Sequence, residues 1–130
     1  MSEQSKIEYW IDTAEYDLKT AEAMLETKRF LYVGFMCHLV VEKLLKAYFV
    51  KVYEKVPPYT HNLLYLAEKT DLTNQLDEHQ KDFLDFLQPF NVRARYPVNK
   101  EMLSKLLDFN NCKEIITKTK EMVEWIKSRL

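Results

Sequence analysis

Residues 30–53, with the sequence FLYVGFMCHLVVEKLLKAYFVKVY, decide the fold class. Apolar residues recur along this stretch at helical spacing and cover most of the helix circumference: Phe35, Leu39, Val40, Val41, Leu44, Leu45, Tyr48, Phe49 and Val52. A helix that is apolar on most faces lies at the centre of a bundle or at an oligomer interface. Gly34 inside it costs about 1 kcal/mol relative to Ala, which indicates a close approach by another helix.

The segments on both sides of this stretch carry helix signals of their own. Residues 7–27 have apolar residues every three to four positions, and Ser5 with Glu8 has the spacing of a capping box. The proline pair at 57–58 ends the central helix, because proline cannot donate the amide hydrogen bond that a helix interior needs. A short helix is then expected over residues 61–70.

A fourth helix is expected over residues 74–87 and is ended by Pro89. Residues 88–99, QPFNVRARYPVN, are predicted to be a loop. Helical segments follow at residues 100–109 and from Asn111 to about residue 130, and these two can also form one bent helix. The sequence therefore predicts an all-α, up-and-down bundle of four long helices plus one short helix, in a single domain over residues 1–130.

Composition limits the classes of function that the chain can have. Of its 130 residues, 47% are hydrophobic and 30% are charged, which is ordinary for a globular protein. The net charge of −1 gives no general positive field, so any RNA contact has to be a local patch. There is no apolar signal segment, and residues 31–41 are too short to cross a bilayer. We therefore expect a cytoplasmic, non-membrane protein whose two cysteines stay reduced.

A polar stripe crosses the otherwise apolar central helix. His38 and Glu42 are four residues apart, as are Glu42 and Lys46, so each pair shares one helix face, and Lys43 lies beside them. The stripe can face a ligand or a partner, or it can be an intrahelical network that only satisfies His38. Spacing alone favours the second interpretation, since such pairs are common on helices.

A second candidate site is the segment RARYP at residues 93–97. The guanidinium groups of Arg93 and Arg95 beside the ring of Tyr96 can form a compact site for a phosphate or a nucleobase. The same arginines can instead pair with acidic helix residues such as Glu42. His61, in the expected short helix, is either a general acid or base or an ordinary surface residue.

No other motif indicates a metal or a cofactor. The sequence contains no Cys-x-x-Cys pair, no Gly-rich phosphate loop and no nucleophile elbow. His38, Glu42 and His61 together are a weak pattern for a metal site. We therefore expect neither a metal nor a cofactor.

Taken in order, these residues resemble the HEPN family, the higher eukaryote and prokaryote nucleotide-binding domains, over nearly the whole chain. The pieces that match are Trp10, Ala14, Asp17-Leu18 and Ala21, then Val41 to Ala47, His61-Asn62-Leu63, Ala94 to Pro97, and Trp125-Ile126. The resemblance implies an up-and-down helical bundle that is commonly a homodimer. In prokaryotes it implies a frequent neighbour, a minimal nucleotidyltransferase, in pairs that look like toxin–antitoxin modules.

Many HEPN proteins are metal-independent ribonucleases in which an Arg is followed, after four to six residues, by a His, and the two meet across the dimer. None of the arginines of this chain has a His at that spacing: Arg29, Arg93, Arg95 and Arg129. The central helix also departs from relatives that read His-Ala-Gln-Gln-Ala-Val-Glu-Lys, because Met36 takes the His position and His38 replaces the first Gln. The usual ribonuclease mechanism is therefore in doubt.

Three hypotheses follow. The first, which we favour, is a binding protein that holds a nucleotide or RNA or acts with a minimal nucleotidyltransferase; its site residues are Arg93, Arg95, Tyr96, His38, Glu42, Lys43, Lys46 and His61. The second is a metal-independent endoribonuclease in which His61 is the general acid or base and Arg95 stabilises charge on the phosphate. The third is a structural dimerisation module held by ion pairs among Glu42, Lys46 and Arg95.

Overall fold

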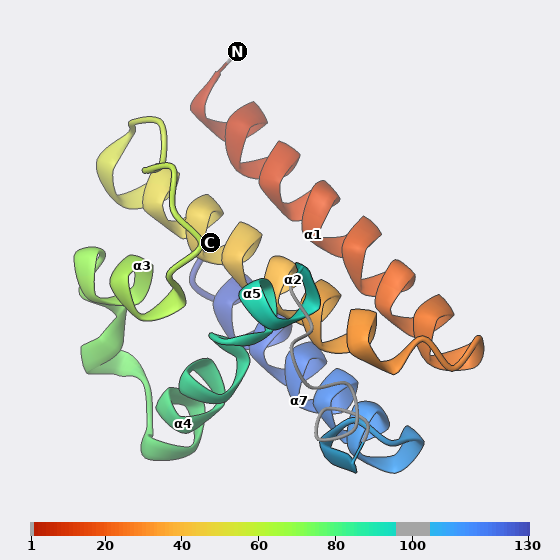
Figure 1. Ribbon diagram of the computed structural model, residues 1–130. Helices are drawn as coiled ribbons and strands as arrows, with labels where there is room; N and C mark the ends of the chain where they lie inside the picture. The colour runs from red at the N-terminus through yellow and green to blue at the C-terminus, as the bar shows by residue number, and fades with distance from the viewer. Residues whose placement is uncertain (1, 96–104) are drawn as a thin grey trace.

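The structure is a computed structural model that describes residues 2–95 and 105–130, without the side chains of residues 93–95. Within these ranges every regular element is helical (Figure 1). The elements are α1 (Glu3–Glu26), α2 (Phe30–Tyr53), α3 (Leu63–Lys69), the 3-10 helix η1 (Leu72–Gln75), α4 (Glu78–Leu87), α5 (Phe90–Arg95) and α7 (Phe109–Lys127). The chain is an all-α bundle, as the sequence predicted.

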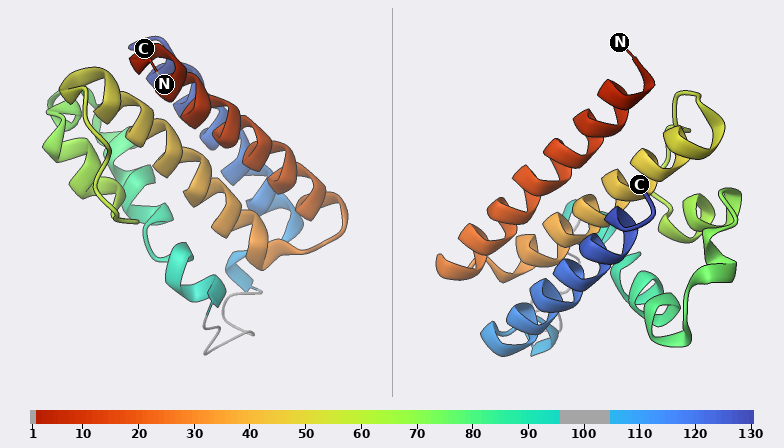
Figure 2. Two further views of the ribbon diagram at one scale, coloured as in Figure 1. Left: turned by 90° about the horizontal axis from the view of Figure 1, so that it is seen from above. Right: turned by 180° about the vertical axis from the view of Figure 1, so that it is seen from behind.

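The helix α2 lies at the centre of the bundle. It packs against α1, α3, α4, α5 and α7. α1 runs antiparallel to it, α7 lies along both, and α3 and α4 lie on the side of α2 away from α1 (Figures 1 and 2). Its fully buried apolar residues are Val33, Cys37, Val40, Val41, Leu44, Leu45, Ala47 and Val50. Each buried Val or Leu side chain contributes roughly 1.5–3 kcal/mol, so α2 supplies a large part of the core.

The close approach expected at Gly34 is made by α5. A Cβ atom at position 34 would lie 2.9 Å from Cδ1 of Phe90, the first residue of α5. The ring of Phe90 is itself fully buried. Because only glycine lacks a Cβ, only glycine lets this ring lie directly on the α2 backbone. The contact seats α5 on the same face of α2 as the polar stripe.

α5 corrects the prediction of a loop over residues 88–99. Pro89 ends α4, as expected, but a new helix begins at the next residue, and the nitrogen of Val92 donates to the Pro89 carbonyl at 3.2 Å. Proline is tolerated there because the first residues of a helix have no intrahelical partner for their amides. Residues 96–99 of the expected loop lie outside the described residues.

The N-caps of α1 and α7 lie earlier than expected. Ser2 caps α1, since its Oγ accepts a hydrogen bond from the Ser5 nitrogen at 3.1 Å, and the expected capping box beginning at Ser5 is wrong. Asp108 caps α7 by accepting from the Asn111 nitrogen at 2.8 Å, so this helix starts before Asn111. Of the helix expected over residues 100–109, only residues 105–109 are described.

The helices expected over residues 61–70 and 74–87 are both shorter than predicted. Asn62 caps α3, its side chain accepting from the Tyr65 nitrogen at 3.0 Å, which leaves His61 outside the helix. Asp77 and Gln80 form a capping box at the start of α4, and η1 takes the residues before it. His61 therefore lies in the segment between α2 and α3 and not in a helix.

Candidate functional site

The polar stripe of α2 is buried in the described structure. His38, Glu42 and Lys46 are 0%, 3% and 7% exposed. They follow one another at four-residue intervals, on the face that begins at Gly34 under Phe90. The stripe therefore faces the segments packed on α2 and not open solvent.

Glu42 is the centre of this cluster. Its Oε2 accepts from Nζ of Lys46 at 3.1 Å, and its Oε1 accepts from Nδ1 of His61 at 2.8 Å. Nδ1 of His38 lies 3.7 Å from the same Oε1. A carboxylate this deeply buried is tolerated only when several donors compensate its lost hydration. The structure thus brings together His38, Glu42, Lys46 and His61, four of the residues singled out from the sequence.

Lys46 is held from both sides. Besides its bond to Glu42, its Nζ lies 5.7 Å from the centroid of the Trp10 ring of α1, within the range of a cation–π contact. With 8% of its side chain exposed, Lys46 has little access to a ligand. Its role in the cluster is to hold the Glu42 carboxylate.

His61 lies in the segment between α2 and α3 and is the surface member of the cluster, with 37% of its side chain exposed. Its backbone is fixed by Gln88: the Gln88 Nε2 donates to the His61 carbonyl at 3.2 Å, and the Gln88 Oε1 accepts from the Leu63 nitrogen at 2.7 Å. Since Nδ1 is bonded to Glu42, Nε2 is the ring nitrogen that can meet a ligand. The fully exposed ring of Tyr59 lies 6.0 Å from the His61 ring, centroid to centroid.

Gln88 and Tyr59 are site residues that the sequence analysis missed. Gln88 stood at the start of a predicted loop, and no local pattern indicates a side chain that bonds a backbone segment 25 to 27 residues away. Tyr59 directly follows the proline pair. An aromatic residue in such a turn was the one sequence feature that could have indicated its place in the site. Asn91 of α5 is also buried, and its Nδ2 has no hydrogen-bond partner within the described part of the chain.

Lys43 of α2 does not belong to the cluster around Glu42. Its Nζ is 2.5 Å from Oδ2 of Asp17 on α1, so it joins α1 to α2 and does not contact the Glu42 carboxylate. The spacing on α2 placed Lys43 beside the stripe, but residue 43 follows 42 by about 100° around the helix. The structure thus places Lys43 in an interhelical ion pair, apart from the Glu42 cluster.

The arginine segment is described only in part. Arg93 and Arg95 lie in α5, while their side chains and all of Tyr96 lie outside the described residues. The backbone of α5 begins two residues after Gln88, whose side chain bonds the His61 segment. The start of α5 is therefore close to His61.

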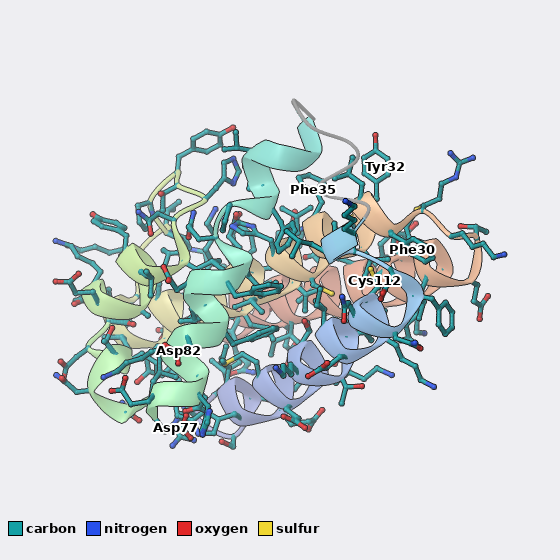
Figure 3. All side chains as sticks on the ribbon, turned by 60° about the horizontal axis from the view of Figure 1, so that its bottom comes forward. Phe30, Tyr32, Phe35, Asp77, Asp82 and Cys112 are labelled. Carbon is teal, nitrogen blue, oxygen red and sulfur yellow. The ribbon has the colours of Figure 1, made fainter. Side chains whose placement is uncertain are left out.

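Both cysteines are free thiols in the core. Burial raises the pKa of Cys37 to about 12 and that of Cys112 to about 11. Cys112 donates weakly from Sγ to the Phe30 carbonyl at 3.7 Å, at the start of α2 (Figure 3). Thiols held in the protonated form are poor nucleophiles, so neither cysteine is suited to catalysis at neutral pH.

No group of three or more His, Cys, Asp or Glu side chains is arranged to hold a metal ion in residues 2–92 and 105–130. None of the described helices is both long and apolar enough to cross a membrane.

Comparison with protein-family models identifies a match to the HEPN domain over residues 7–129. The chain belongs to the HEPN family. Neither the curated proteins nor the solved structures contain a match to it. In this HEPN domain the family match includes every residue of the cluster around Glu42, from Trp10 of α1 to Gln88 at the end of α4. The family is associated with nucleotides and RNA, and the all-α fold agrees with the resemblance noted from the sequence.

Proposed function

We propose that this HEPN domain is a binding module for a nucleotide, or for the phosphate and base of an RNA, at the surface formed by His61, Tyr59 and α5. The observation that carries the proposal is the pair of Glu42 and His61. A buried carboxylate holds one ring nitrogen of a partly exposed histidine and leaves the other free for a ligand. We call this the His61 surface.

His61 is held in place by hydrogen bonds within the chain itself. The Glu42 carboxylate is anchored by Lys46, and the His61 backbone is anchored by Gln88. Side chains that are already held in place lose little conformational entropy on binding, so more of the interaction energy appears as affinity. A solvated surface histidine with no such support would not favour a binding function in the same way.

The chemistry of the His61 surface suits a phosphate next to a base. In its protonated form the imidazole donates from Nδ1 to Glu42 and from Nε2 to a ligand oxygen. The Tyr59 ring offers a face on which a base can stack. α5, which begins beside His61, carries Arg93 and Arg95, and guanidinium groups bind phosphate in a bidentate manner. Such a local patch suits a chain whose net charge is −1.

Titration with AMP and with a fluorescein-labelled single-stranded RNA at two salt concentrations tests the proposal. We expect saturable binding that weakens with salt. His61→Ala removes a charge-assisted hydrogen bond worth about 1.5–3 kcal/mol, so affinity should fall about tenfold or more. His79→Ala, which removes an exposed histidine of α4, is the matched control and should bind normally. Unchanged affinity in both His61→Ala and Arg95→Ala would show that the site assignment is wrong.

A second candidate function is cleavage of RNA, favoured by the same carboxylate–histidine pair. With Nδ1 donating to Glu42, Nε2 of a neutral His61 is a proton acceptor. It would take the proton of a ribose 2′-hydroxyl, whose oxygen forms a bond to the adjacent phosphorus while the bond to the 5′-oxygen breaks. The proton returns to that leaving oxygen, and Arg95 stabilises the charge on the phosphate.

Incubation of end-labelled RNA with the protein in EDTA tests this second function. Cleavage to 2′,3′-cyclic phosphate ends, lost in His61→Ala and in Arg95→Ala but retained in His79→Ala, would support it. Intact RNA after long incubation at high protein concentration would leave binding alone as the function.

We extend the proposal to a cytoplasmic homodimer that works with a minimal nucleotidyltransferase in a toxin–antitoxin-like module. In support of a dimer, α1 exposes Tyr9 and Tyr16, seven residues apart and so on one face, and exposed tyrosines are enriched at interfaces. Sedimentation velocity should give a dimer that dissociates in Tyr9→Lys/Tyr16→Lys. A monomer at micromolar concentration would contradict the dimer, and an unrelated neighbouring gene would count against the module.

A further inference from the structure

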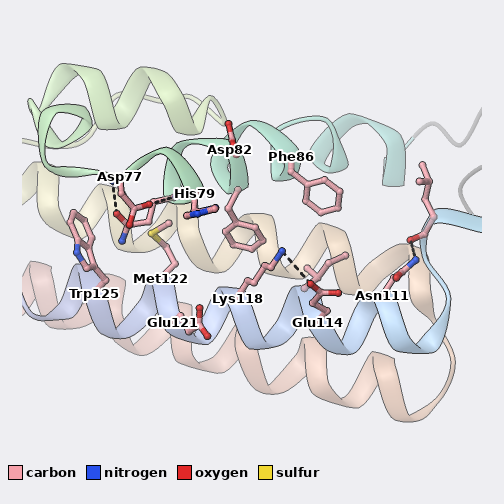
Figure 4. A pocket seen from close by; sticks show the side chains of 14 residues that line it. Asp77, His79, Asp82, Phe86, Asn111, Glu114, Lys118, Glu121, Met122 and Trp125 are labelled. Carbon is pink, nitrogen blue, oxygen red and sulfur yellow. Dashed lines mark hydrogen bonds and ion pairs between the residues drawn. The ribbon is translucent and has the colours of Figure 1, made fainter.

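A groove that does not involve the His61 surface runs between α4 and α7, with a volume of about 870 Å³ (Figure 4). Its floor is apolar and includes Phe83, Ile115 and Met122. Trp125 lies at one end, and Phe86 and Asn111 lie toward the other (Figure 4). The groove thus has an apolar floor and runs along two helices whose side chains form polar rims.

The length of the groove matches a helical ligand. The α7 residues that line it share one face of that helix: Asn111, Glu114, Ile115, Lys118, Glu121, Met122 and Trp125. From the first to the last of these, α7 rises roughly 21 Å, which is about four turns of a helix laid alongside. Grooves between two helices are a recurrent seat for amphipathic helices, whose apolar residues at i, i+3, i+4 and i+7 enter the groove.

Phe86 and Leu106 are the apolar side chains of the groove that remain open to solvent, while Phe83, Ile115 and Met122 on its floor are buried. Phe86 stacks with Phe83 at 6.4 Å and meets Phe90 edge-on at 5.3 Å, but it is still 44% exposed. Leu106, which also lines the groove, is exposed as well. Exposed apolar groups gathered in one groove and rimmed by polar residues mark an interaction site.

The rims of the groove are acidic. Its lining residues include four carboxylates and one lysine: Asp77, Asp82, Glu114, Glu121 and Lys118. Lys118 is paired with Glu114 at 3.3 Å, and Asp77 is used in the cap of α4. Asp82 on α4 and Glu121 on α7 make no hydrogen bond or ion pair within the described parts of the chain, and they lie on opposite rims (Figure 4).

We propose that the α4–α7 groove binds a basic amphipathic helix of another protein. Its apolar face would lie on the exposed side chains of Phe86 and Leu106. Its lysines or arginines would reach Asp82 and Glu121 on the two rims. The chain already packs a cation at the end of the groove, where the guanidinium carbon of Arg129 lies 3.6 Å from the centroid of the Trp125 ring.

A second copy of this chain is a poor fit for the groove. A two-fold contact through this face would bring the four carboxylates of each protomer against those of the other, and like charges at an interface oppose association. A basic partner reverses the sign of that interaction. The proposal does not require ligand binding at the His61 surface, because the groove and that surface share no residue.

The test uses a fluorescein-labelled 18-residue helical peptide of leucine and lysine, with the leucines on one face, followed by anisotropy. We expect one-to-one saturable binding that weakens at high salt. A peptide of the same composition with leucines spread around the helix, and an amphipathic peptide of leucine and glutamate, should each bind at least tenfold more weakly. Asp82→Lys/Glu121→Lys should weaken binding at least tenfold. Asp12→Lys/Glu26→Lys, which reverses two exposed carboxylates of α1, should bind normally.

Several outcomes would overturn the proposal. Equal binding of the two lysine peptides would mean general charge attraction, and no binding would mean that the groove takes no such helix. A chain that sediments as a dimer and becomes a monomer in Phe86→Lys would show that a second copy occupies the groove. NMR chemical-shift changes in the unmodified protein provide a check that needs no variant, and they should centre on residues 82–86 and 114–125.

Discussion

Replacing Glu42 by Gln removes the negative charge at the centre of the buried cluster and keeps the shape of the side chain. Lys46, whose Nζ lies 3.1 Å from the carboxylate and whose side chain is 8% exposed, then becomes a buried cation without a counter-charge. Breaking such a pair costs about 3–5 kcal/mol. The Trp10 ring, 5.7 Å from Nζ, offsets about 1 kcal/mol of this. We expect a loss of about 2–4 kcal/mol, which for a domain of this size lowers Tm by about 8–16 °C.

Urea unfolding followed by circular dichroism at pH 7 measures this loss. Glu42→Gln/Lys46→Met removes both charges and should recover more than half of it, because no unpaired charge remains buried. Glu114→Gln is the matched control, since its pair with Lys118 at 3.3 Å is exposed; it should cost less than about 1 kcal/mol.

Two results would refute the reasoning. A loss below about 1 kcal/mol in Glu42→Gln would mean that the cluster does not depend on the Glu42 charge. A double variant less stable than the single one would mean that the Lys46 charge is held by other groups. If Glu42→Gln is destabilised but keeps its affinity for AMP, the cluster is a structural network that fixes the His61 segment and not part of a binding site.

Three further changes probe the packing around the cluster. Gly34→Ala places a Cβ 2.9 Å from Cδ1 of Phe90, and overpacking of about 1–3 kcal/mol outweighs the roughly 1 kcal/mol gain in helix propensity. Thermal unfolding should show a net loss, and adding Phe90→Leu should remove most of it. Burial raises the pKa of Cys37 from its ordinary value of 9.0 to about 12 in the folded protein, so this thiol loses its proton first in the unfolded chain. Stability should therefore fall above pH 9 by about 1.4 kcal/mol per pH unit from this thiol, so the slope is shallower in Cys37→Ala. Gln88→Ala removes the partners of the Leu63 nitrogen and the His61 carbonyl; denaturant unfolding should show a loss of about 1–2 kcal/mol, with faster amide exchange at Leu63.

Local signals were sufficient to predict the central helix. The bounds Phe30–Tyr53 were predicted as observed, because the dense apolar pattern and the proline pair that follows are both properties of neighbouring residues. The ends of other helices depended on which of several capping residues was used. The N-caps in the structure are Ser2 and Asp108, and not the later candidates Ser5 and Asn111. Periodicity cannot decide between two possible N-cap residues that lie a few positions apart.

α5 was missed for a related reason. Pro89 was interpreted as the end of one helix, followed by a loop. Proline is also common at the first residues of a helix, so the same residue is compatible with the end of one helix and the start of the next. What decides between them is the burial of the Phe90 ring against Gly34, a contact between residues far apart in the chain. The glycine alone predicted that some element would approach, but not which one.

Only the part of the candidate site that lies on α2 could be predicted from the sequence. The spacing of His38, Glu42 and Lys46 places them on one face whatever the rest of the fold does. The hydrogen bond from His61 to Glu42 and the two hydrogen bonds of Gln88 join residues that are 19 to 27 positions apart. Helical spacing predicts only contacts between residues a few positions apart, so it could not predict these bonds.

The last turn of α4 connects the two surfaces for which we propose ligands. Phe86 lines the α4–α7 groove, while Gln88, two residues later, holds the segment of His61. A helix that settles on Phe86 would contact the same turn whose Gln88 side chain holds the His61 segment. Any coupling between the two ligands would therefore pass through this turn, and it would change the affinity of each ligand by the same factor.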